Sequence, residues 1–137
     1  MKNILTAIYG KFTGSELSSD VGGRIFLDQA PDNCEFPYVV YSVVSVIPDD
    51  VFGKKGKQSL IQFSLFSANP SAVEITDMHT DLKALFDDCS MTITSNTLLW
   101  MHEVNLTTMV EDITVGEGAQ SVKAWHADYE VITQVSA

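Results

Sequence analysis

Apolar and polar residues repeat along this chain with two different periods, which predict two helices and six strands. Residues 3–12 and 70–88 repeat apolar side chains at helical spacing, and Asn69 and Pro70 are residue types that favour the start of a helix. Six other segments are rich in β-branched and aromatic residues or alternate in polarity, as strands do. These segments are residues 24–27, 38–47, 58–67, 91–94, 98–110 and 122–135.

The apolar positions of one strand and of the second helix indicate where the core lies. In residues 58–67 the alternate side chains Ile61, Phe63 and Leu65 are apolar, so this face of the strand is expected to be buried. The second helix carries an apolar stripe that should pack against that face, while Asp81 lies on its polar side. The stripe consists of Ile75, Met78, His79, Leu82, Leu85 and Phe86.

Helices and strands are segregated along the chain rather than strictly alternating, which is typical of α+β domains. We therefore predict an α+β fold with a mostly antiparallel sheet, on one face of which a long helix and an N-terminal helix are packed. The strands over residues 38–47 and 58–67 are expected to form an antiparallel hairpin. With no repeat, linker or low-complexity segment, residues 1–137 are predicted to be a single domain.

The charge balance excludes several kinds of partner. The chain has 18 acidic and 8 basic residues, a formal net charge of −10. Such a charge repels nucleic-acid phosphates and anionic lipids at long range. No apolar run is long enough to cross a bilayer, and the N-terminal residues do not resemble a secretory signal. The sequence therefore predicts no membrane association, no sequence-specific DNA binding, and a protein that stays in the cytosol where it is made.

The polar segment between the two hairpin strands is the candidate binding site that the charge pattern indicates. It holds the only basic cluster of the chain, and a lysine cluster can dock electrostatically on an acidic partner. A solvated hairpin tip accounts for the same pattern, so both interpretations stay open at this point. The candidate partner-binding residues are Asp49, Asp50, Phe52, Lys54, Lys55 and Lys57.

One strand also carries a pattern that could support acid–base chemistry. His126, Asp128 and Glu130 share a face of the last predicted strand by alternation, and a carboxylate beside a histidine can transfer protons. The simpler interpretation is the solvated face of a strand whose other face is core, and we favour it. A closed apolar pocket around these side chains would indicate a small acid–base enzyme rather than a solvated strand face.

Metal and cofactor sites are not predicted. His79, His102 and His126 come from separate elements and show none of the short spacings of a metal clamp. Cys34 and Cys89 are expected to be free thiols. No phosphate-binding glycine loop and no nucleophile motif is present. We therefore expect no enzyme activity and no cofactor.

The order of several segments resembles the tail-completion, or tail-terminator, proteins of long-tailed bacteriophages and prophages. The first segment is Val21-Gly-Gly-Arg-Ile-Phe-Leu-Asp-Gln-Ala-Pro, followed by Phe36-Pro-Tyr-Val-Val-Tyr-Ser-Val-Val-Ser and by Ile61-Gln-Phe-Ser-Leu-Phe-Ser-Ala, which leads into the second helix. The closing run Ala127-Asp-Tyr-Glu-Val is similar to the last strand of that family. This chain departs from the family by Phe26, where tyrosine is usual, by Phe66, where tryptophan is common, and by having few Lys and Arg residues.

The resemblance implies a structural role without catalysis. It implies a virion protein of the tail neck, made in the cytoplasm of the host bacterium, that forms a homo-hexameric ring at the head-proximal end of the tail tube. That ring would stop tube growth and join tail to head, with the tail-tube protein and a head connector or stopper protein as partners. DNA would only pass through its lumen. A different neck, adaptor or tail-tube protein remains the alternative within this class.

Overall fold

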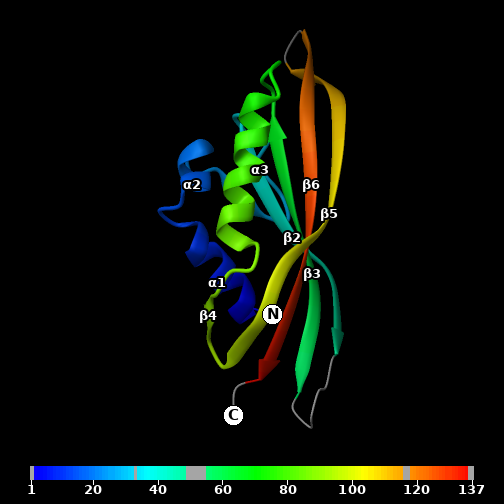
Figure 1. Ribbon diagram of the computed structural model, residues 1–137. Coiled ribbons are helices and arrows are strands. Elements are labelled where there is room, and N and C mark those ends of the chain that lie inside the picture. The colour runs from blue at the N-terminus through cyan, green and yellow to red at the C-terminus, as the bar shows by residue number, and fades with distance from the viewer. Residues whose placement is uncertain (1, 33, 49–54, 116–117, 136–137) are drawn as a thin grey trace.

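The described residues form a curled six-stranded sheet with three helices beside it (Figure 1). The computed structural model describes residues 2–32, 34–48, 55–115 and 118–135, with residues 111–115 and 118–120 described by their backbone alone. The predicted α+β class is confirmed by this mixture of elements. None of the described helices is long and apolar enough to span a membrane.

Of the three described helices, the second begins at a side-chain cap, whereas the residue before the third, Ala72, provides none. Helix α1 spans Lys2–Phe12 and α2 spans Glu16–Asp20, where the Ser15 hydroxyl accepts a hydrogen bond from the Ser18 N–H at 3.1 Å. Helix α3 spans Val73–Phe86. The predicted start of this helix at Asn69 and Pro70 is wrong, because the Asn69 side chain accepts from the Ser71 N–H and closes a turn of its own before the helix.

The strand bounds match the predicted strands within a few residues, except that β5 and β6 are longer. They are β1 (Ile25–Leu27), β2 (Tyr38–Pro48), β3 (Gly56–Ser67), β4 (Thr92–Ile93), β5 (Asn96–Val115) and β6 (Gly118–Val135). The order across the sheet is β1-β2-β3-β6-β5-β4. All described neighbours are antiparallel except β1 and β2, which run parallel. The predicted hairpin of β2 and β3 is confirmed.

Strands β5 and β6 extend beyond the rest of the sheet. Strand β3 pairs with β6 only as far as Lys123, whereas β5 pairs with β6 over its full length to Val115 opposite Gly118. The last part of β5 and the first part of β6 therefore form a two-stranded ribbon, seen at the top of Figure 1. An isolated two-stranded ribbon is marginally stable in water, which makes this end of the molecule a candidate for contact with another chain.

The core lies between the sheet and the helices and centres on aromatic rings. Phe63 of β3 stacks on Phe86 of α3 with ring centroids 4.8 Å apart and meets Tyr129 of β6 edge to face at 5.3 Å. Phe12 of α1 contacts both Phe63 and Phe86. These rings are buried, together with the predicted face at Ile61, Phe63 and Leu65. Of the six residues in the predicted stripe of α3, four are buried (Ile75, Met78, Leu82 and Phe86), while His79 and Leu85 are half-buried. The predicted core face of β3 is therefore confirmed.

Replacing Leu82 by alanine should lower the free energy of unfolding by about 2–5 kcal/mol, since Leu82 is fully buried and its loss leaves a cavity. Leu99, which is half exposed on β5, provides the matched control, and Leu99→Ala should change the free energy of unfolding by about 0.5 kcal/mol or less. Chemical denaturation of both variants measures the difference. Equal effects would contradict the assigned core.

Candidate assembly surfaces

The candidate hairpin site is described only in part. Asp49, Asp50, Phe52 and Lys54 lie outside the described residues, while Lys55 and Lys57 are described and exposed. The Lys55 carbonyl accepts a hydrogen bond from the Val135 N–H at 2.9 Å, and Lys57 pairs with Pro48 on β2 and Thr133 on β6. The two lysines are thus held at the end of the sheet, beside the last residues of β6.

Lys55 and Lys57 border an apolar groove at this end of the sheet. The groove has a volume of about 330 Å³, and its lining consists of Val46, Pro48, Lys55, Gly56, Lys57, Asn96, Thr133 and Val135. Val46 and Val135 in the lining are exposed, as is the neighbouring Ile47. An apolar floor with a basic rim suits contact with a protein surface that carries apolar and acidic groups.

Three β-bulges place further apolar side chains in solvent. The strand register skips one residue at Val44 in β2 and at Leu99 and Val104 in β5. These residues are 53%, 51% and 47% exposed. A bulge re-aims the extra side chain and twists the strand, so all three point apolar groups away from the core. Sequence reasoning missed this role, because a bulge leaves no clear mark in a run of alternating residues.

The candidate acid–base residues are brought onto one face of the sheet but bind different neighbours. His126 Nδ1 lies 2.7 Å from the Ser64 hydroxyl, and Gln62 donates to Asp128 at 3.0 Å. Glu130 accepts from Gln58 at 2.9 Å and lies 3.9 Å from His102 Nε2. Four cavities in the described part of the chain are lined by other residues and not by His126, Asp128 or Glu130. Cross-strand pairing therefore accounts for this face.

The remaining histidines and cysteines also have structural surroundings. His79 Nε2 lies 2.7 Å from Glu103, which also forms an ion pair with Lys83 at 3.5 Å. Over the described part of the chain, no group of three or more potential metal ligands is found. Cys34 and Cys89 are free, and burial raises the pKa of each thiol, which disfavours the reactive thiolate.

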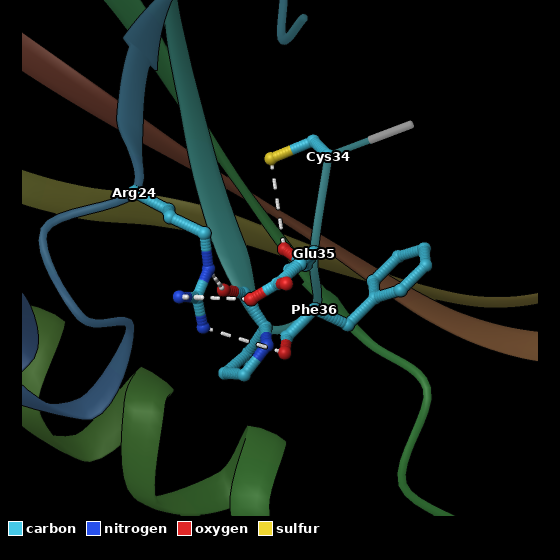
Figure 2. Close-up of polar contacts among 5 residues, drawn as sticks. Arg24, Cys34, Glu35 and Phe36 are labelled. Atoms are coloured by element: carbon cyan, nitrogen blue, oxygen red, sulfur yellow. Dashed lines mark hydrogen bonds and ion pairs between the residues drawn. The ribbon is translucent and has the colours of Figure 1, made fainter. Parts of the chain in front are cut away.

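Arg24 fixes the segment that leads into β2 (Figure 2). Its Nε donates to the Pro37 carbonyl at 3.0 Å and its Nη2 donates to the Phe36 carbonyl at 3.3 Å, while Nη1 lies 3.9 Å from the Glu35 carboxylate. Gly22 makes room for this side chain, because a Cβ there would lie 3.0 Å from Arg24 Nη1 and its φ of +59° favours glycine. The contact joins two sequence segments that resemble the tail-completion proteins.

Helices α2 and α3 bring four carboxylates together. Partial burial of its carboxyl raises the pKa of Asp20 to about 7, and a hydrogen bond with Asp81 and the charges of Asp81, Glu16 and Asp77 add to this rise. Asp81, placed by the sequence on a polar helix face, therefore contacts Asp20 rather than solvent alone. This surface is strongly acidic.

The chain is similar to known proteins in both sequence and fold. The family model described as "Tail completion protein gp17" matches residues 6–126. A solved chain from "Virion of native gene transfer agent (GTA) particle" superposes with a TM-score of 0.76 at 10% identity, covering 97% of this chain and 96% of that one. A second solved chain gives a TM-score of 0.54 at 12% identity, covering 95% and 94%. At these identities the structural likeness shows a shared fold. No curated protein matches the chain.

The substitution Asp20→Asn should stabilise the protein at pH 8 and weaken the pH dependence of its stability. The pKa of Asp20 is raised on folding from 3.8 to about 7, so the folded state binds the proton of this carboxyl more tightly than the unfolded state does. The stability that the bound proton provides is therefore lost as pH rises from about 4 through 7. Asparagine does not titrate, so the variant does not lose stability over this pH range. Urea unfolding at pH 5 and pH 8 tests this, with Asp32→Asn, in an exposed loop, as the control for loss of one negative charge. An equal gain at both pH values would contradict the assignment.

Proposed function

Because this chain belongs to the tail completion protein gp17 family and is therefore a structural component of a phage virion, we propose that it closes the head-proximal end of the tail tube as a ring. The ring is a homo-hexamer that stops tube growth and then joins the tail to the head. Its partners are the tail-tube protein on one side and a head connector or stopper protein on the other. The match of the family model over residues 6–126 carries this proposal.

Two features of the molecule support a ring subunit. A closed ring needs two different, complementary surfaces on each copy, and this chain exposes apolar side chains both at the lysine-bordered groove and along β5. The net charge of −10 also suits a lumen through which DNA passes without binding. The similar chain in the gene transfer agent virion has the same fold over nearly its whole length.

Removing the gene from the phage or prophage that encodes this chain tests the proposal directly. Without a terminator, tails should grow beyond their normal length and remain separate from filled heads, as seen by electron microscopy. A plasmid-borne copy should restore both tail length and joining. Loss of all tails would identify a tube subunit instead, and normal tails that fail to join heads would identify an adaptor.

The hairpin lysines provide a test of the partner-binding residues. Replacing Lys54, Lys55 and Lys57 by glutamate should leave the melting temperature nearly unchanged, since the described Lys55 and Lys57 are exposed. Ring formation or tail attachment should weaken, because the basic rim becomes acidic. Light scattering with and without isolated tail tubes measures assembly.

The double variants Lys55→Glu/Lys57→Glu and Lys2→Glu/Lys11→Glu change the net charge equally and separate a local effect from a general one. Only the first pair should impair assembly. A marked fall in melting temperature with assembly preserved would instead show that the hairpin lysines stabilise the fold.

A further inference from the structure

In the part of the chain that the structure describes, the outer edge of β5 is covered along its first part. Strand β4 pairs with Asn96 and Thr97. Further along, the Asp88 N–H donates to the Met101 carbonyl at 2.7 Å, and the Asp87 carboxylate accepts from the Glu103 N–H at 3.0 Å. The backbone groups of Met101 and Glu103 therefore point away from β6, and the turn after α3 satisfies them.

Beyond Val104 no described strand other than β6 pairs with β5, and we call this part of its edge open. Residues 105–115 have β6 as their single neighbour among the described strands. The extra residue at Val104 shifts the alternation of the backbone by one, so the N–H groups of Leu106, Thr108 and Val110 point outward. Residues 104–110 contain no charge, proline or glycine, and Val110 is 69% exposed. In natural proteins, charged residues or proline on an edge strand usually prevent another strand from pairing with it. An edge of this composition that lacks them is a site of strand pairing.

Among the described residues, the opposite side of the sheet has a second open edge. Strand β1 ends at Leu27, opposite Tyr41, so residues 42–48 of β2 have β3 as their single described strand neighbour. The Asp28 N–H donates to the Tyr41 carbonyl, which shows that Tyr41 points outward, and the extra residue at Val44 turns the N–H of Val46 outward as well. Pro48 lacks an N–H and ends this open segment.

We propose that the open edge of β5 pairs with the open edge of β2 in a second copy of this chain. Strands β2 and β5 run in opposite directions through the sheet, so copies arranged side by side form an antiparallel pair. The two edges are different surfaces, and their pairing is therefore head-to-tail, as a ring requires. They lie at opposite ends of the sheet (Figure 1), so neighbours are staggered along the strands, and the strands must be tilted against the axis of a closed ring. The inference rests on the proposed ring and specifies its contact.

Charge supports a second copy as the occupant. Two copies with a net charge of −10 repel each other over most of their surface, but residues 36–48 and 104–110 are uncharged. Antiparallel pairing places the Pro48 end of β2 near the Val104 end of β5. Lys57, which pairs with Pro48, then lies near Asp87 and Asp88 of the other copy. Opposite charges thus meet at one end of the paired strands.

Proline substitutions that remove a single outward N–H test the pairing. Thr108→Pro blocks the β5 edge and Val46→Pro blocks the β2 edge, whereas Thr108→Ala and Val46→Ala keep both N–H groups. Each proline variant should fold but remain monomeric by light scattering, alone and with isolated tail tubes, while the alanine variants assemble as the wild type does. An equimolar mixture of the two proline variants should stop at a 1:1 dimer, because each supplies one intact edge.

Several outcomes would overturn the pairing. Wild-type assembly of either proline variant would exclude these edges while leaving the proposed ring intact. A Val46→Pro homodimer would show that β5 pairs with itself. If the wild-type chain assembles neither alone nor with isolated tail tubes, both the proposed ring and this contact are overturned. If Thr108→Pro lowers the melting temperature sharply, Thr108→Lys guards the same edge with a charge and must also remain monomeric.

Discussion

The hydrogen-bond ladders on both sides of β6 are the interaction on which the rest of the molecule depends. Strand β6 pairs with β3 over residues 123–134 and with β5 over residues 118–135. Because side chains alternate along a strand, this one register places Ala127, Tyr129 and Val131 in the core. The same register places the polar side chains of β6 opposite polar partners on the other face. A shift by one residue would exchange the two faces and lose both arrangements.

The core explains why the sheet can carry such long strands. Phe63 contacts Phe12, Phe86 and Tyr129 at once, so rings from two helices and two strands meet at one point. This contact anchors the middle of the sheet. The ends of β2 and of the β5–β6 ribbon lie beyond it, and there apolar side chains such as Ile47 and Val110 are exposed. Exposed apolar groups at both ends of a firmly held sheet favour association with other chains.

The sequence predicted the parts of the fold that depend on periodicity. The core face of β3 and the stripe of α3 follow from apolar spacing, and burial of Leu65 and Leu82 confirms them. The predicted helix start at Asn69 was wrong, because the asparagine side chain closes a turn with Ser71 before the helix begins. The parallel pairing of β1 with β2 and the bulge at Val104 were not predicted, since they depend on contacts between distant segments.

For the candidate surfaces, the charge could be predicted from the sequence but the position of each strand in the sheet could not. A charge pattern in the sequence indicated the hairpin lysines, and the structure adds that Lys57 borders an apolar groove. The open edges of β2 and β5 became visible only when the strand order was known, because their composition matches that of a buried strand. In a central strand, residues 104–110 would be ordinary; at an edge, the same uncharged run leaves backbone groups without a strand partner. Position in the sheet, rather than residue type, therefore turns these segments into a surface for assembly.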